Sequence, residues 1–489
     1  MIPLVVVENP KRWPFDMEGV EVVPARAYLT DPHYADLRRV TVFNVCRRYG
    51  YQSLGYYVSL LAAARGHKPM PSVSTLQTLS MSPVLRIVGE DLDETIQKSL
   101  SHLRSEEFSV SIYFGRNVAA RYDRLSRALF NQFPAPFLRA RFAWEEGRWR
   151  MVGVRAIAAA EIPDSHRDFV LQRARDYFQR PTKLAPRSPD TRYDMAILWS
   201  ENDPMPPSNE RAIRRLTRAA GRQGIGVDII GPDDYGRLAE YDALFLRETT
   251  AVNHHTFRFA SRAKAEGLVV LDDPESIIRC GNKVYQAELF ERYKIPAPKT
   301  LVVHEGNVGE VVARVGLPCV LKKPDGSFSS GVAKATTPEE LKTKLDILFE
   351  ESELVVAQEF APSAFDWRVG VLDGQPLYAA RYHMAKWHWQ IIHAQGGSTR
   401  YGDVEPVAIE DAPKNVVEVA VKAARLIGDG IYGVDLKEVE GRVVIMEVND
   451  NPNLDGGFED GILKDALWDE IIRWFRVRLD RRGLEGRQA

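Results

Sequence analysis

Apolar and polar positions follow two different periods in the first 180 residues of the chain. Apolar residues recur every three to four positions in LGYYVSLLAAARG (54–66) and RDFVLQRARDYFQ (167–179), which is the spacing of amphipathic helices. Short, mainly apolar runs, which are typical of strands, occur at 3–7, 40–45 and 108–114. This part of the chain is therefore predicted to form a mixed α/β domain.

Strand and helix patterns alternate after residue 193. Strand-like runs occur at 194–200, 226–230, 242–248 and 268–274, with helical patterns at 210–224 and 257–267. Such alternation is typical of a parallel sheet, because each parallel connection needs room for a crossover helix. A small parallel-sheet domain is predicted here. The segment PTKLAPRSPDTRYD (181–194) holds three prolines among polar residues and is the best candidate for the linker that precedes it.

The length and composition of the chain indicate a soluble protein of several domains. At 489 residues the chain exceeds what one hydrophobic core usually serves, so roughly two to four domains are expected. Apolar residues make up 45% and charged residues 27%, and no run reaches the roughly 18 apolar residues of a membrane span. The amino end, MIPLVVVENPKRW, lacks the basic segment and cleavage site of a signal peptide. We expect a cytoplasmic protein with no membrane partner.

Cysteine usage and charge distribution narrow the picture further. Cys46, Cys280 and Cys319 are far apart and odd in number, so they are predicted to be buried thiols and not disulfide or zinc ligands. Residues 1–192 hold 28 Lys and Arg against 20 Asp and Glu, whereas the rest of the chain holds 37 against 47. A basic segment can attract nucleic acid or an acidic substrate, but these basic residues are dispersed and no RNA-binding signature accompanies them. A nucleic-acid partner is therefore not expected.

Two apolar runs near the carboxyl end, in GVDLKEVEGRVVIMEVN, predict a hairpin. We expect a three-residue loop, Val439-Glu440-Gly441, that places Glu438 opposite Arg442, because glycine suits the left-handed last position of such a loop. This register pairs Val434 with Met446 and Leu436 with Val444. One face would then be apolar, and the other would carry Asp435, Lys437, Glu447 and Asn449.

The polar face of this hairpin is a candidate metal site. Asp435, Glu447 and Asn449 would bring two carboxylates and an amide together beside the segment DNPNLDGG. Hard oxygen ligands of this kind suit Mg²⁺, which usually takes one or two carboxylates together with water and nucleotide phosphate. A solvated polar strand end would show the same spacing, so other segments must decide between the two interpretations.

Two upstream segments offer groups suited to a nucleotide. LKKPDGSFSSGVAKA reads as strand, Gly/Ser loop and strand, in which small residues let backbone N–H groups close around phosphate and a lysine neutralises it. It is not a Walker A loop, since no G-K-[ST] follows, and an ordinary hairpin turn explains it as well. VVAQEF (355–360) is a strand that ends in Gln358 and Glu359, which could hydrogen-bond an adenine edge.

Taken together and in this order, the segments resemble the ATP-grasp superfamily, and in particular the RimK-like carboxylate–amine ligases. The resemblance rests on LKKPDGSFSSGV, VVAQEF, FDWRVGV, the AAxxxxAK pattern at 379–386, GVD and MEVNDNPNLDGG, and it covers about residues 195–478. The first third resembles the extra domain found ahead of some RimK-like proteins. The resemblance implies an N-terminal α/β domain (1–185), a small parallel-sheet pre-ATP-grasp domain (193–280) and an ATP-grasp domain (281–478) in which two α+β lobes clamp ATP.

The resemblance also implies roles for particular residues. Asp435, Glu447 and Asn449 would bind Mg²⁺, with Mn²⁺ as a substitute, between the phosphates of ATP. The other implied nucleotide contacts are Lys283 and Lys322 to phosphate, Ser327, Ser329 and Ser330 in the phosphate loop, and Gln358 and Glu359 along the adenine and ribose. Arg368 and Lys386 would stabilise the transferred phosphoryl group. RimK-like enzymes usually have paired arginines within AAxxxxAK, whereas this chain has His383-Met384, so Arg381 is expected to substitute from the same strand face.

The reaction implied is ATP-dependent amide formation through an acyl phosphate, in which glutamate or another amino acid could be added to a peptide, protein or small metabolite. A small-molecule kinase and a non-catalytic ATP-binding scaffold are the alternatives. Asn451 and Asn453 are candidates for contacting the amine or carboxylate substrate, although turn geometry also favours Asn around Pro452. His383 could line the substrate pocket or simply pack. Arg247 follows a strand of the parallel sheet and could pair with a substrate carboxylate or form a surface salt bridge. The sequence leaves the oligomeric state open.

Overall fold

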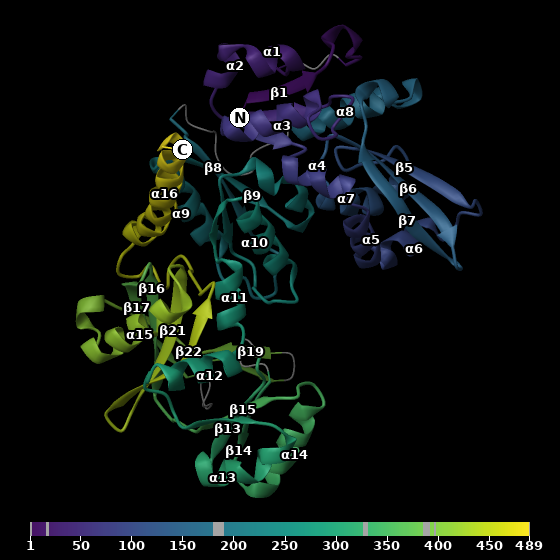
Figure 1. The fold of residues 1–489 in the computed structure, drawn as a ribbon. Coiled ribbons are helices and arrows are strands. Elements are labelled where there is room, and N and C mark those ends of the chain that lie inside the picture. The colour runs from purple at the N-terminus through teal and green to yellow at the C-terminus, as the bar shows by residue number, and fades with distance from the viewer. Residues whose placement is uncertain are drawn as a thin grey trace. The chain divides into compact units, whose positions relative to one another are not determined.

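A computed structural model describes residues 2–15, 19–178, 190–325, 331–384, 392–395 and 398–488 (Figure 1). The chain forms two compact units, of which the first comprises Met1–Lys183 with Gly231–Tyr241 and the second Leu184–Ile230 with Asp242–Ala489. The predicted linker at 181–194 falls mostly outside the described residues. Cys46, Cys280 and Cys319 are free and buried, as predicted.

The first unit contains a parallel sheet and an antiparallel sheet. The parallel sheet has the order β2-β1-β3-β4, and the antiparallel sheet has the order β5-β6-β7. Its strands are β1 (Ile2–Val7), β2 (Glu21–Pro24), β3 (Val40–Asn44), β4 (Lys68–Met70), β5 (Glu107–Tyr113), β6 (Phe137–Glu145) and β7 (Arg148–Ala156). Every residue of β3 is buried, which is the pattern of a strand covered on both faces. The strands predicted at 3–7, 40–45 and 108–114 are confirmed.

Eight α-helices surround these sheets in the described part of the first unit. They are α1 (Ala25–Thr30), α2 (Pro32–Asp36), α3 (Leu54–Ala64), α4 (Val73–Ser80), α5 (Ser82–Asp91), α6 (Asp93–Leu100), α7 (Asp123–Gln132) and α8 (Arg167–Phe178). The short helical turns are η1 (Pro10–Arg12), η2 (Ala120–Tyr122), η3 (Ala159–Glu161), η4 (Asp164–His166) and η5 (Pro232–Glu240). The helices predicted at 54–66 and 167–179 correspond to α3 and α8.

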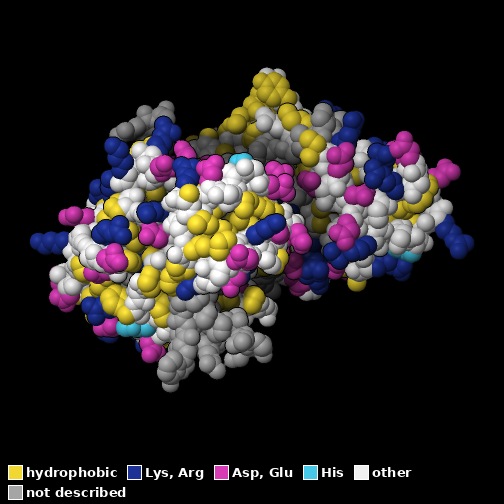
Figure 2. Space-filling view, turned by 90° about the horizontal axis from the view of Figure 1, so that it is seen from below, with side chains coloured by type: hydrophobic (Ala, Val, Ile, Leu, Met, Phe, Trp, Pro, Cys, Tyr) yellow, Lys and Arg dark blue, Asp and Glu magenta, His cyan; other side chains and the backbone are white. Residues whose placement is uncertain are grey.

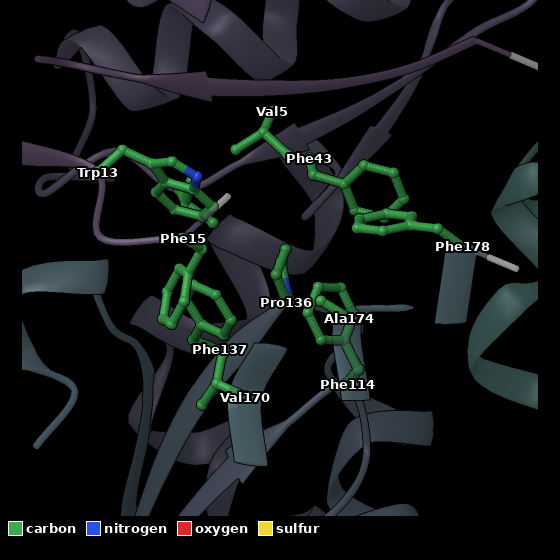
Figure 3. Close-up of a pocket in the computed structure, with 11 residues that line it drawn as sticks. Val5, Trp13, Phe15, Phe43, Phe114, Pro136, Phe137, Val170, Ala174 and Phe178 are labelled. Atoms are coloured by element: carbon green, nitrogen blue, oxygen red, sulfur yellow. The ribbon is translucent and has the colours of Figure 1, made fainter. Parts of the chain in front are cut away.

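A cavity of about 10 Å³ lies in the apolar core of the first unit. Aromatic side chains, among them Trp13, Phe43, Phe114 and Phe178, point into it from several elements (Figure 3). A space of this size holds about one water molecule, and apolar walls give that water no partner. The cavity is therefore a packing gap and not a substrate site.

The second unit begins with a parallel sheet of order β11-β10-β8-β9. Its elements are β8 (Tyr193–Leu198), α9 (Glu210–Arg222), β9 (Ile225–Ile230), β10 (Ala243–Leu246), α10 (His255–Ala265), β11 (Val269–Leu271) and α11 (Pro274–Cys280). The alternating strands and helices predicted for this stretch are confirmed. The last helix, α16 (Asp465–Gln488), lies beside α9 (Figure 1) and buries Trp468, Ile472 and Phe475 in the core of this sheet.

Two further antiparallel sheets and a two-stranded one, β18-β19, complete the described part of the second unit. The smaller sheet has the order β12-β15-β13-β14, and the larger sheet has the order β20-β17-β16-β21-β22. The smaller sheet and its helices comprise α12 (Lys283–Arg292), β12 (Thr300–Val303), η6 (Glu305–Glu310), α13 (Val311–Arg314), β13 (Cys319–Lys322), β14 (Val332–Ala335), α14 (Pro338–Phe349) and β15 (Val355–Glu359). The remaining elements are β16 (Phe365–Leu372), β17 (Gln375–His383), β18 (Ile392–Gln395), β19 (Ser398–Tyr401), β20 (Val404–Val407), η7 (Ile409–Asp411), α15 (Lys414–Ile427), β21 (Ile431–Val439) and β22 (Arg442–Asp450). Helix α15 covers the apolar face of the larger sheet, so the other face is left to carry polar side chains.

Candidate active site

The hairpin formed by β21 and β22 exists, but its register differs from the prediction. Glu440 and Gly441 both have positive φ values, so a two-residue turn replaces the predicted three-residue loop, and Val439 pairs with Arg442. A bulge between Asp435 and Leu436 then adds one residue to the β22 side. The predicted pairs Val434–Met446 and Leu436–Val444 are therefore wrong. Val434 pairs with Val448, and Leu436 pairs with Ile445.

The bulge leaves the three predicted oxygen-bearing side chains on one face. Asp435 lies directly opposite Glu447 in the ladder, and the amide of Asn449 donates to Asp435 Oδ2 over 3.1 Å. Arg368 of the neighbouring strand donates from Nε and Nη2 to the two oxygens of Asp435, at 2.5 and 2.7 Å. Burial raises the pKa of Asp435 to about 6, although the Arg368 charge acts in the opposite direction.

Three lysines from different elements surround these carboxylates. Lys283, the first residue of α12, has its Nζ 3.9 Å from Glu447 Oε2, and Lys437 Nζ lies 2.7 Å from Asp366 Oδ1. Lys322 ends strand β13. Burial lowers the pKa of Lys322 to about 8, and Lys283 and Lys437 add repulsion that the charge of Glu447 opposes. Burial alone would raise the pKa of Glu447, but the charges of the nearby lysines and of Arg368 lower it overall.

Lys437 and Asp366 were not predicted as site residues, although the sequence placed Lys437 on the polar face of the hairpin. Asp366 shares the face of Arg368, because both lie at even positions of β16. With Lys283, Lys322 and Arg368, the site holds four cationic side chains beside three carboxylates, those of Asp366, Asp435 and Glu447. This balance suits a ligand with several negative charges.

Gln358 and Glu359 lie at the end of β15, next to β13. The Gln358 side chain accepts from Lys322 Nζ at 2.8 Å and donates to Thr300 Oγ1 at 3.1 Å, so both ends of its amide are engaged. The hydrogen bonds favour a role for Gln358 in orienting Lys322 over the predicted contact with adenine. Glu359 Oε2 accepts from the backbone N–H of Lys299 at 3.2 Å, and its nucleotide contact stays a prediction.

Arg381 and His383 do not share the face of Arg368. In the register between β16 and β17, Arg368 pairs with Ala380, and Trp367 pairs with Arg381. The Arg381 guanidinium accordingly lies over the ring of Trp367, with 5.0 Å to its centroid. This register argues against Arg381 acting beside Arg368, and the site roles of Arg381 and His383 stay predictions. Both side chains instead interact with Glu405.

Two tyrosines of β17, Tyr378 and Tyr382, lie on the same sheet face as Arg368. The sequence had not identified either of them as a site residue. Tyr382 lies under Arg368, with 4.9 Å from the guanidinium carbon to the ring centroid, and it donates to Glu459. Tyr378 donates to the backbone carbonyl of Asn453 at 3.2 Å. The alternation of residues along β17 could have identified both tyrosines had the pairing with β16 been known.

Arg247 is fully buried and braces the segment that follows β22. It donates to Asn451 Oδ1 at 2.5 Å and to the carbonyl of Pro452 at 2.8 Å, and also to Ser208 and to the carbonyl of Pro207. Asn451 in turn donates to the carbonyl of Glu248 at 2.6 Å. Neither the predicted substrate contact nor the surface salt bridge of Arg247 fits this burial. We assign Arg247 and Asn451 to positioning.

Several predicted site residues lie outside the described residues, namely Ser327, Ser329 and Ser330 of the Gly/Ser loop and Lys386 of the AAxxxxAK pattern. Their roles stay predictions, as does the substrate contact of Asn453. Within the described ranges, no group of three or more His, Cys, Asp or Glu side chains is arranged to hold a metal, so the hairpin offers two carboxylates and an amide. On the face shown in Figure 2, basic and acidic side chains are interspersed.

A smaller sheet and a preceding helix that bring Lys322 and Lys283 to the polar face of a larger sheet, after a parallel-sheet domain in the chain, are the arrangement of an ATP-grasp enzyme. Comparison of the sequence with known protein families supports this class. Residues 25–173 match the RimK-like ATP-grasp N-terminal domain, and residues 280–474 match the RimK-like ATP-grasp domain. The chain therefore belongs to the RimK-like ATP-grasp family and is an ATP-dependent ligase.

Curated relatives carry the name probable alpha-L-glutamate ligase. The protein from Vibrio vulnificus is 25% identical over 233 residues, which cover 47% of this chain and 74% of that protein. The protein from Psychromonas ingrahamii is 27% identical over 223 residues, which cover 45% of this chain and 71% of the relative. In the described part of the chain, no helix combines the length and apolar character that a membrane crossing requires.

Solved structures similar to the chain include a RimK domain ATP-grasp protein from Sphaerobacter thermophilus. It has a TM-score of 0.45 and 17% identity, covering 57% of this chain and 98% of that one. The D-alanine–D-alanine ligase from Bacillus anthracis has a TM-score of 0.45 and 14% identity, covering 60% of this chain and 99% of that one.

Proposed function

We propose that this ligase uses the polar face of β16, β21 and β22 to activate a carboxylate with ATP and then joins it to an amine. One observation carries the proposal. Four cationic side chains, Lys283, Lys322, Arg368 and Lys437, converge on a face that also offers the oxygens of Asp435, Glu447 and Asn449. The residue ranges 1–185, 193–280 and 281–478 remain our proposed domain boundaries.

The oxygen donors fit a magnesium ion that is shared with nucleotide. Two carboxylates and one amide oxygen are too few to enclose Mg²⁺, which prefers an octahedron of hard oxygen ligands at 2.0–2.1 Å. Asp435, Glu447 and Asn449 would hold one side of the ion, and ATP phosphates and water would supply the rest. Bound there, Mg²⁺ would neutralise phosphate charge, and Mn²⁺ is proposed as a substitute.

The charges of the chain explain how a carboxylate could attack ATP. Both reactants are anionic, so the attack brings like charges together, and Lys322, Lys283 and Arg368 offset that repulsion. The substrate carboxylate attacks the γ-phosphorus, ADP leaves, and an acyl phosphate forms. The amine then attacks the acyl carbon, which forms the C–N bond and releases phosphate. Asn453 and Lys386 are proposed to contact the substrates during these steps.

The names of the relatives suggest which substrates to examine first. L-Glutamate is proposed as an amine substrate, with an amino acid, a peptide or a protein tail supplying the carboxylate. Arg381 and His383 lie on the sheet face opposite to that of Arg368, so neither is included in our proposed substrate pocket. Tyr378, Tyr382 and Asn453 are our candidates for contacting a substrate on the face of Arg368.

Trapping with hydroxylamine tests the proposal. The purified protein would be incubated with Mg·ATP, hydroxylamine and each member of a panel of amino acids and dipeptides, and both ADP and product masses would be followed. A ligase converts its acyl phosphate into a hydroxamate, whereas a kinase gives a stable phosphoester. ADP release with a phosphorylated product and no hydroxamate would refute the ligase. The variant Asp435→Asn serves as the control, because it should release no ADP above background.

A further inference from the structure

A buried glutamate and a histidine form a pair at the carboxyl edge of the parallel sheet, outside the ATP-binding face. Glu248 lies two residues beyond β10 and is only 3% exposed. Its Oε2 lies 2.6 Å from Nε2 of His255, the first residue of α10, and its Oε1 has no hydrogen-bond partner among the described residues. An unpartnered carboxylate oxygen at such depth is costly, and ligands gather at this edge of parallel sheets.

The hydrogen bond to Glu248 fixes the proton distribution on His255. A carboxylate accepts only, so the proton of the neutral ring lies on Nε2 and the lone pair lies on Nδ1. The charged and titratable groups around the ring are Glu248 at the end of β10, His254 at a centroid distance of 4.0 Å, and Asp203 near His254. His255 keeps 29% of its side chain exposed, so a ligand can reach it.

The pair is tied directly to the segment that follows the metal-ligand strand. Asn451 donates to the carbonyl of Glu248 at 2.6 Å, and Asn451 is two residues beyond Asn449. Since consecutive Cα atoms are about 3.8 Å apart, the Cα atoms of Asn449 and Asn451 are within about 8 Å of one another. Thr250, two residues beyond Glu248, donates to Asp450 at 2.7 Å, which ties the same two segments a second time.

We propose that the pair of Glu248 and His255 deprotonates the amine substrate, with His255 Nδ1 taking a proton from its ammonium group, an inference that rests on the ligase function proposed above. Glu248 Oε2 holds the ring in place and stabilises the imidazolium that forms. The neutral amine attacks the acyl carbon, and the bond from that carbon to the phosphate oxygen breaks with its electron pair. The second proton of the amine leaves with the phosphate, so one proton remains on His255.

Two nucleophiles separate this role from a purely structural one. Hydroxylamine is a weak base and is already neutral at pH 7, so it needs no proton acceptor, whereas L-glutamate is protonated at its amino group. His255→Gln should therefore keep hydroxamate formation within about twofold of wild type but lose about 100-fold or more of amide formation, which is the usual worth of a general base. Amide formation by the variant should recover as the pH rises and the amine becomes neutral in solution.

Glu248→Gln should show the same selective loss, and His254→Gln, a neighbouring ring without a carboxylate partner, should retain both activities. Thermal unfolding of each variant checks that it folds. An equal loss of hydroxamate and amide in a folded His255→Gln variant would overturn the inference, as would full retention of both. Wild-type protein that forms no hydroxamate with any carboxylate of the panel would refute the ligase function itself and the inference with it.

Discussion

Lys322 carries a charge that the folded chain must bury before any nucleotide arrives. Burial lowers its pKa from 10.5 to about 8, with additional repulsion from Lys283 and Lys437. One pKa unit corresponds to about 1.4 kcal/mol, so the protonated side chain costs the folded state roughly 3 kcal/mol relative to an exposed lysine. Replacement by methionine removes this cost, but it also removes the hydrogen bond to Gln358, which is worth about 1 kcal/mol.

Lys322→Met should therefore raise the free energy of unfolding by about 2 kcal/mol in the absence of nucleotide, as measured by urea denaturation at pH 7. The sign of the pH dependence follows from the lowered pKa. Below about pH 8 the lysine is protonated in both the folded and unfolded chain, so the full cost applies. Between pH 8 and 10.5 the folded protein loses this proton first, so the advantage of the variant should shrink.

The same substitution should weaken binding of Mg·ADP by about 10- to 100-fold in calorimetric titration, because a buried lysine–phosphate contact is worth about 1.5–3 kcal/mol. Lys342→Met is the matched control. It removes an exposed lysine of α14 and should change both quantities by no more than about 0.5 kcal/mol. A Lys322→Met protein that is less stable than wild type would show that Lys322 is not a desolvated charge. A variant that binds Mg·ADP as well as wild type would show that Lys322 is not a phosphate ligand.

Three further substitutions test the geometry of the site. Asp435→Asn leaves the buried guanidinium of Arg368 without its carboxylate, so it should lower the free energy of unfolding by about 3 kcal/mol in urea denaturation. Unchanged stability would contradict the ion pair. Arg381→Gln should leave kcat within about twofold of wild type and should lower the free energy of unfolding by about 1 kcal/mol, because its aromatic contacts are lost. A large loss of kcat would show that Arg381 acts in catalysis. Arg247→Lys should cost about 3 kcal/mol, because the acceptors on Asn451, Pro207 and Pro452 lose their fork of donors, and full stability would exclude the proposed brace.

Helices, strands and motif order could be predicted from the sequence because they depend on local patterns. The alternation between 194 and 280 identified the parallel sheet, and the oxygen-bearing residues in GVD and in MEVN identified the hairpin face. Arg247 could not be assigned in this way. Its position at the end of a strand left a substrate contact and a surface salt bridge open, but its partners, Pro207 and Asn451, lie far from it in sequence and meet it only in the folded chain.

Two single-residue bulges decide which side chains reach the active site, and neither is visible in the sequence. In the β16–β17 hairpin, Asp373 and Gly374 form a two-residue turn that pairs Leu372 with Gln375, and a bulge between Gly370 and Val371 then shifts the ladder by one residue. Without that shift Arg368 would pair with position 379, and Arg381 would lie on the same side of the sheet as Arg368. Because of the shift, Arg381 lies on the opposite side.

The bulge in the β21–β22 hairpin has the opposite consequence. Its two-residue turn alone would pair Asp435 with Met446 and would place Glu447 on the apolar face, away from the carboxylate it must join. The extra residue restores the pairing of Asp435 with Glu447. A three-residue loop would have given the same parity, which is why the predicted face was right although the predicted register was wrong. The candidate metal site thus depends on a local irregularity of the ladder that strand periodicity alone does not encode.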